Sequence, residues 1–203
     1  MKVLTMRVWM LGLLLALPAV AAGDERVMLI RTPDGGIQPQ AAMDDQGILH
    51  LIYFKGEPGA GDVFYVRREP GKEGFSAPIR VNSQPGSVIA AGTVRGAHIA
   101  LGKRGRVHVA WMGSKTAEPK GPANMSPMLY ARMNDNSTAF EPQRNLIQFE
   151  FGLDGGGSLA ADKSGNVYVA WHAGPHSKGE ENRRVWITRS KDEGKTFARE
   201  VAA

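Results

Sequence analysis

The feature that most constrains the fold is a short segment that occurs three times along the chain. Each copy holds a polar turn that ends in glycine, followed by a run rich in β-branched and aromatic residues. The turn glycines are Gly47, Gly105 and Gly165, so the copies recur after 58 and then 60 residues. A repeat of this length indicates one supersecondary unit that buries its apolar face against copies of itself.

The chemistry of each copy predicts strands. Glycine supplies the positive φ that a tight hairpin turn needs, and the run that follows it, such as 167–171, has the composition of a strand. Each unit continues with a third strand, a second turn that ends in phenylalanine, and a short fourth strand. The third strands are expected at 63–67, 128–132 and 185–189, the phenylalanines are Phe75, Phe140 and Phe197, and fourth strands are expected at 79–81 and 199–201. The sequence therefore predicts an all-β fold of three four-stranded antiparallel blades of a β-propeller.

Two sets of residues recur at fixed places in these expected strands. Tyr53, Trp111 and Trp171 share one position, and core packing between blades is the favoured interpretation over stacking on a sugar. His50 and His108 share another position, which favours strand residues over catalysts.

The amino terminus predicts export. Lys2 and Arg7 are followed by an apolar run at 8–17, then by Pro18 and a small-x-small cleavage pattern at 19–21. We expect a signal peptide at 1–21, a secreted or periplasmic mature protein, and no membrane contact after cleavage; a membrane anchor or a buried strand is the alternative. The remaining expected divisions are an N-terminal segment at 22–36, in which 26–30 could supply a closing strand, blade 1 at 37–93, blade 2 at 94–153 and blade 3 at 154–203.

Composition excludes several classes of protein. The chain has no cysteine, so it holds neither a disulfide nor the acylated cysteine of a lipoprotein. Its net charge of +5 is spread without a block of Lys and Arg, so no nucleic-acid partner is expected. His172 and His176 are separated by Gly174 and Pro175, which exclude the helix that a paired-ligand metal site would need. We therefore expect no metal and no cofactor.

Residues 190–197 carry the most specific motif. They fit the pattern S-x-D-x-G-x-T-[WF] at every fixed position, through Ser190, Asp192, Gly194, Thr196 and Phe197. In such a turn the Asp carboxylate accepts backbone N–H groups, the glycine adopts the left-handed conformation and the aromatic ring packs beneath. Residues 133–140 are a degraded copy that keeps Asp135 and Phe140, and the first unit keeps only Gly74-Phe75. We expect a structural role for these residues.

With this turn placed after a third strand, the chain resembles the sialidase-like (BNR/Asp-box) β-propeller family over residues 37–201. The resemblance implies half of a six-bladed ring, which missing blades or a second copy would have to close. It also implies that the Asp-box is structural and lies on the face away from the ligand. Substrate would bind at the opposite end, where first strands begin. The loops that lead from second into third strands are expected at the same end, at 55–61, 113–126 and 172–184.

Four residues at that opposite end are candidates for binding a ligand: Arg95, Asp154, His172 and Arg183. Arg95 could bind a carboxylate through two hydrogen bonds, and Asp154 precedes three glycines where backbone could approach a ligand. The alternative for Arg95 is a solvated loop arginine, and the alternative for Asp154 is an ordinary Asp-Gly turn. For Arg183 the alternative is a local ion cluster with Glu180 and Glu181. Gln38 occupies the corresponding place in the first blade.

The resemblance to sialidases also implies three arginines and a Tyr–Glu pair that acts as nucleophile. Ile37 stands where the first arginine is expected, and no Tyr–Glu pair is found in this chain. We therefore predict a glycan-directed, sialidase-like propeller fragment that is not catalytically complete by itself, with its catalytic residues unassigned. The alternative is a non-catalytic secreted propeller that binds a protein or a polymer.

Overall fold

The computed structural model describes residues 27, 29–92, 96–150, 153–174 and 180–203. The chain divides into two compact units, Met1–Ile30 and Arg31–Ala203. The signal peptide expected at 1–21 lies outside the described residues and stays a prediction. Of the expected closing strand, Val27, Leu29 and Ile30 are described, and none of them belongs to a strand. No described helix is long and apolar enough to cross a bilayer.

The unit Arg31–Ala203 contains three four-stranded antiparallel sheets, each a simple meander in chain order. The sheets, here called blades 1, 2 and 3, account for nearly all of the regular structure of the described residues, and the other described elements are short 3-10 turns. Blade 1 comprises β1 (Ile37–Met43), β2 (Leu49–Glu57), β3 (Ala60–Arg68) and β4 (Ile79–Arg80); blade 2 comprises β5 (His98–Leu101), β6 (Val107–Met112), β7 (Met128–Arg132) and β8 (Arg144–Asn145); blade 3 comprises β9 (Leu153–Ala161), β10 (Val167–Ala173), β11 (Arg184–Ser190) and β12 (Val201–Ala202). The 3-10 turns are η1 (Pro33–Gly35), η2 (Lys103–Gly105), η3 (Pro122–Asn124) and η5 (Glu180–Asn182).

The repeated turn between first and second strands forms for a local reason. In blade 3, Asp162 Oδ1 accepts hydrogen bonds from the backbone N–H groups of Ser164 and Asn166. Gly165 then adopts a φ of 93°, which a residue with a side chain rarely takes. Blade 1 repeats this arrangement around its own turn aspartate, whereas blade 2 has a glycine at the equivalent position. The recurring sequence pattern therefore fixes where each hairpin reverses.

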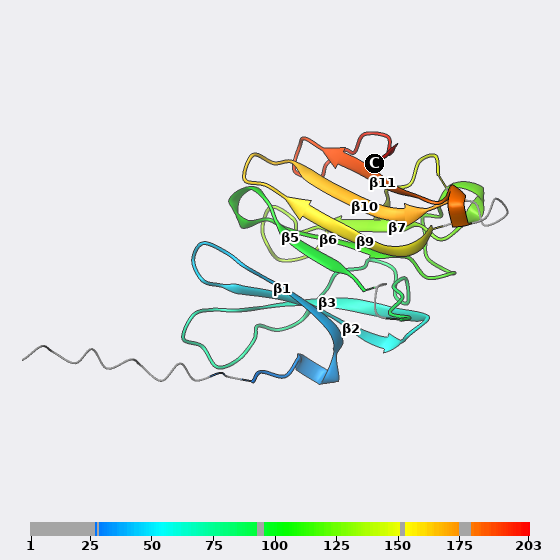
Figure 1. Cartoon of the computed structure of the whole chain (residues 1–203). Helices are drawn as coiled ribbons and strands as arrows, with labels where there is room; N and C mark the ends of the chain where they lie inside the picture. Colours follow the sequence, from blue (N-terminus) through cyan, green and yellow to red (C-terminus); the bar gives the residue numbers. More distant parts are fainter. Residues whose placement is uncertain (1–26, 28, 93–95, 151–152, 175–179) are drawn as a thin grey trace, which may run out of the picture. The chain divides into compact units, whose positions relative to one another are not determined.

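The blades stack face to face in chain order, from blue through green to orange in Figure 1. One apolar cluster joins blades 1 and 2, with Ile52 packed in the same core as Trp111, and a second joins blades 2 and 3, with Met128 in the same core as Trp171. Tyr53 is 1% exposed and belongs to a third cluster on the other face of blade 1. Burial of these side chains removes large apolar areas from water, which supplies the main stabilisation of stacked blades.

The blades have two distinct ends. The turns between first and second strands and the turn at 190–197 lie at one end, here called the turn end, on the left of Figure 1. The connections between second and third strands lie at the other, here called the loop end. In blade 1 this connection is shorter than the predicted loop at 55–61, because β2 and β3 stay paired as far as Glu57 and Ala60. Blades 2 and 3 keep longer connections, at 113–127 and 174–183.

Candidate functional site

The structure brings three of the four predicted ligand-binding residues together at the loop end of blade 3. Asp154 lies near the start of β9, His172 lies in β10 opposite Gly155, and Arg183 directly precedes β11. An Arg183 Nη1–H group donates to Asp154 Oδ2, and His172 Nδ1 lies 3.9 Å from the same oxygen. Arg183 therefore pairs with Asp154.

The three side chains differ in their access to solvent. The Arg183 side chain is 6% exposed, whereas those of Asp154 and His172 are 31% and 40% exposed. A buried guanidinium thus holds the carboxylate in place, while the carboxylate and the imidazole keep accessible faces. Gly155 and Gly156 beside them have no side chains to cover the backbone. The arrangement offers a hydrogen-bond acceptor and an imidazole that can donate or accept, which suits a ligand rich in hydroxyl groups.

The fourth candidate, Arg95, lies outside the described residues and stays a prediction. The segment before it is anchored by Gln38, whose Nε2 donates to the carbonyl groups of Ala90 at 3.0 Å and Gly92 at 2.8 Å. Gln38 itself has a φ of 49° and sits at an irregularity in the pairing of β1 with β2. Blade 1 thereby contacts the connection that leads into blade 2 at the loop end.

The turn at 190–197, here called the box turn, is tied by its own side chains. Ser190 Oγ donates to Asp192 Oδ1 at 2.7 Å and accepts the Gly194 N–H at 2.8 Å. Asp192 also accepts hydrogen bonds from the backbone N–H and the hydroxyl of Thr196. Burial raises the pKa of Asp192, but these hydrogen bonds outweigh it and bring the pKa down to about 2.

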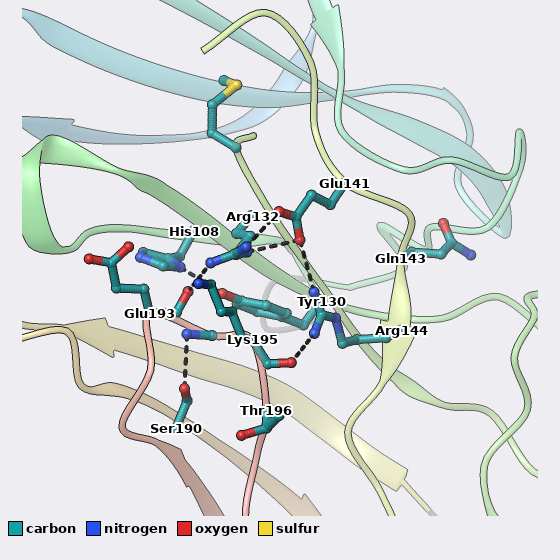
Figure 2. Close-up of polar contacts among 12 residues, drawn as sticks. His108, Tyr130, Arg132, Glu141, Gln143, Arg144, Ser190, Glu193, Lys195 and Thr196 are labelled. Carbon is teal, nitrogen blue, oxygen red and sulfur yellow. Dashed lines mark hydrogen bonds and ion pairs between the residues drawn. The ribbon is translucent and has the colours of Figure 1, made fainter. Parts of the chain in front are cut away.

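The box turn is also docked on blade 2, as Figure 2 shows. The Arg132 guanidinium forms two hydrogen bonds with Glu141 and donates a third to the Glu193 carbonyl at 3.0 Å. Arg144 links the same Glu141 carboxylate to the Lys195 carbonyl at 2.6 Å. These contacts satisfy carbonyl groups of the turn with charged donors, so they fix its position on the neighbouring blade.

An aromatic contact completes the docking. The Phe197 ring meets the Tyr130 ring edge to face, with centroids 4.9 Å apart, and Gly194 lies directly against the Tyr130 hydroxyl. The hydroxyl is bonded to His108 Nδ1 at 2.6 Å. Burial lowers the pKa of His108 to about 3, with Arg106 and Arg132 contributing in the same direction. This neutral, fully buried histidine belongs to the core and is remote from solvent.

The sequence pattern did not reveal Arg132, Glu141 and Arg144 as a group. A signal existed, because Arg67, Arg132 and Arg189 occupy one repeated position at or next to the end of the third strand of each unit. Among the described residues, no group of three or more histidine, aspartate or glutamate side chains could hold a metal ion.

No family model matches the chain, and no curated protein matches it. Among solved structures it is similar to the Hadza microbial sialidase Hz136, with 16% identity, a TM-score of 0.54, and coverage of 80% of this chain and 37% of the sialidase. It is similar also to a protein of unknown function from Dyadobacter fermentans DSM 18053, with 15% identity, a TM-score of 0.54, and coverage of 83% of this chain and 50% of the other.

The described chain folds as blades of a β-propeller. The three antiparallel four-stranded sheets and these two similarities confirm the predicted all-β propeller blades. The chain spans half or less of the length of either solved structure.

Proposed function

We propose that this chain is part of an exported, glycan-directed propeller of the sialidase-like (Asp-box) type, and that it binds sugar at the loop end. The observation that carries the proposal is the Asp154–Arg183 pair beside His172, with an ordered carboxylate open to solvent. A carboxylate that is already held by a buried arginine loses little conformational entropy when it accepts hydrogen bonds from adjacent sugar hydroxyls. The hydrogen bonds within the box turn support the Asp-box assignment.

The proposal includes no catalytic step. Sialidase chemistry would need the arginines and the Tyr–Glu pair, and Ile37 stands at the first of these positions. Recognition of a glycan by the loop end is therefore the function that we assign to this chain, and cleavage is assigned to no residue in it.

The proposal further holds that blade 3 packs against another blade, from a longer chain or from a second copy. Val63, Met128 and Val185 occupy the same position of the third strand, as their cross-strand partners show. The first two are 1% and 0% exposed because the next blade covers them, whereas Val185 is 49% exposed. Val201, on the same face of blade 3, is 60% exposed. Covering these side chains would remove apolar surface from water. Sedimentation of the purified protein tests the second-copy version, which a monomer at all concentrations would contradict.

Glycan binding is tested by titrating the purified protein with sugars selected on a glycan array. Asp154→Asn keeps the size of the side chain and removes its charge, so we expect affinity to fall about tenfold or more, as for loss of a charge-assisted hydrogen bond. The matched control is Asp45→Asn at the turn end, where the carboxylate is 80% exposed. A fluorogenic sialoside would show whether any turnover occurs. The absence of glycan binding, or equal binding by both variants, would refute the proposal.

A further inference from the structure

The turn end carries a groove of about 1090 Å³ that the proposed function does not use. Residues of all three blades line it, from the turns between first and second strands, the end of β3, the degraded box at 133–140 and the box turn. Its volume exceeds that of a single small-ligand pocket, so an extended ligand would fit it best.

The two blade junctions differ in how they border the groove. Between blades 2 and 3, Gly194 of the box turn lies against the Tyr130 hydroxyl and covers that ring. Between blades 1 and 2, the equivalent tyrosine is Tyr65, and it lines the groove together with Met133, Asn134 and Ser137 of the degraded box. The degraded turn therefore borders the groove beside its tyrosine, whereas the intact turn lies directly against the tyrosine of its own junction.

The carboxylates that line the groove are already engaged. The Arg106 guanidinium donates a hydrogen bond to the Asp135 carboxylate at 2.5 Å and another to the Glu193 carboxylate at 3.2 Å. Asp192 is held within the box turn, and Asp44 is held by backbone N–H groups of its own turn and by His50. Hydrogen bonds that occupy a carboxylate reduce its ability to bind further cationic groups.

The cations of the groove are engaged to a lesser extent. Four of them are exposed side chains with no hydrogen bond or ion pair among the described residues: Arg67, Arg104, Lys191 and Lys195. Arg67 comes from blade 1, Arg104 from blade 2, and the two lysines from the box turn of blade 3. The donors that remain free in the groove are therefore positively charged and distributed over all three blades, which favours a ligand with several anionic groups.

The remaining lining groups indicate which kind of polyanion would bind. The aromatic rings of the groove, His50 and Tyr65, are 7% and 4% exposed and are bonded to each other at 2.8 Å, so they offer no platform on which nucleic-acid bases could stack. Ser137 adds a hydroxyl group between the cations, whereas the side chains of Ser76 and Asn134 are hydrogen-bonded to neighbouring residues of their own turns. Cations that surround a neutral hydroxyl suit a chain of sugars that carries anionic groups and free hydroxyls.

We propose that the turn-end groove binds a segment of an anionic polysaccharide, with sulfate or carboxylate groups paired to Arg67, Arg104, Lys191 and Lys195. This site lies at the end of the blades opposite the glycan site at Asp154. A ligand bound in the groove would contact all three blades. Binding there does not depend on the glycan site at Asp154.

The test uses fluorescence anisotropy with the purified protein and two labelled probes, a heparin hexasaccharide for sulfate and a hexagalacturonate for carboxylate. We expect at least one probe to bind, with an affinity that falls as salt is raised. The double variant Arg67→Gln/Lys191→Gln should weaken that binding about tenfold or more, as expected for lost charge-assisted contacts. The control variant Lys115→Gln/Arg184→Gln removes two exposed cations from the loop end and should bind as the unaltered protein does.

Circular dichroism and thermal unfolding establish that both double variants are folded. The two probes separate sulfate from carboxylate recognition. Equal losses in the groove and control variants would overturn the assignment of the site. Tighter binding of a thymidine dodecamer or of a poly-glutamate peptide than of either sugar probe would overturn the ligand class. Binding of neither sugar probe at low salt would overturn the proposal outright, whatever the outcome at Asp154.

Discussion

Replacement of Gly194 by alanine should weaken the junction between blades 2 and 3 more than any other single methyl addition to a turn. Gly194 has a φ of 78° and is buried, and a Cβ atom built on it would overlap the Tyr130 hydroxyl. Two costs follow. The left-handed backbone costs a residue with a side chain about 1–2 kcal/mol. Displacement of the Tyr130 hydroxyl from His108 costs about 1–3 kcal/mol more, because it leaves buried polar groups unpaired.

The expected loss in the free energy of unfolding for Gly194→Ala is therefore about 2–5 kcal/mol. For a domain of this size each kcal/mol lowers Tm by about 2–4 °C, so a decrease of roughly 4–20 °C is expected in a thermal melt. Gly71→Ala is the matched control. Gly71 has a φ of 73°, and nothing lies within 4 Å of the position that its Cβ would take. It should therefore lose only the backbone contribution of about 1–2 kcal/mol. If the two variants melt at the same temperature, the contact between the box turn and Tyr130 does not stabilise the junction.

Two further predictions concern charges in the same junction. Glu141→Gln should lower the free energy of unfolding by about 2–3 kcal/mol, because it weakens the hydrogen bonds of the Arg132 guanidinium, which is 6% exposed; Asp45→Asn, in a pair with Lys163 at the surface, should change it by less than about 1 kcal/mol. Urea denaturation of both variants checks this, and equal effects would contradict it. Stability should also fall as the pH drops below 6.5, because the unfolded chain then protonates His108 while burial keeps it neutral in the folded state until the pH nears 3. His108→Gln should reduce this slope of Tm against pH, and an unchanged slope would refute the assigned burial effect.

Much of the fold could be predicted from local chemistry. The glycines of the repeated turns and the strand runs after them placed each hairpin, because positive φ and β-branched composition are properties of a few adjacent residues. The loop expected at 55–61 was wrong in length, since Pro58 and Gly59 alone suffice for the reversal and pairing continues up to them. Composition marks where a chain turns, but the extent of pairing depends on the partner strand.

The candidate site was predictable only in part. Asp154, His172 and Arg183 were predicted to lie at one end of the blades, yet the pairing of Arg183 with Asp154 was missed because the two residues are 29 positions apart in the chain. The docking of the box turn on Arg132 joins residues 61 positions apart, and the turn-end groove collects side chains from three blades. Such groupings depend on the packing of one blade against the next. The sequence repeat predicts that the blades pack together, but it does not predict which side chains come into contact.

The two junctions between blades differ in their charged contacts, and this difference affects the order in which the blades would separate on unfolding. Charged side chains fasten blade 3 to blade 2 through Arg106, Arg132 and Arg144, whereas the described contacts between blades 1 and 2 are apolar or involve neutral polar groups. High salt or acid should therefore weaken the junction between blades 2 and 3 first. Cooling weakens apolar association, so it should weaken both junctions to a similar extent. Charged contacts at one junction and their absence from the described contacts of the other thus give a stack of similar sheets a preferred order of separation.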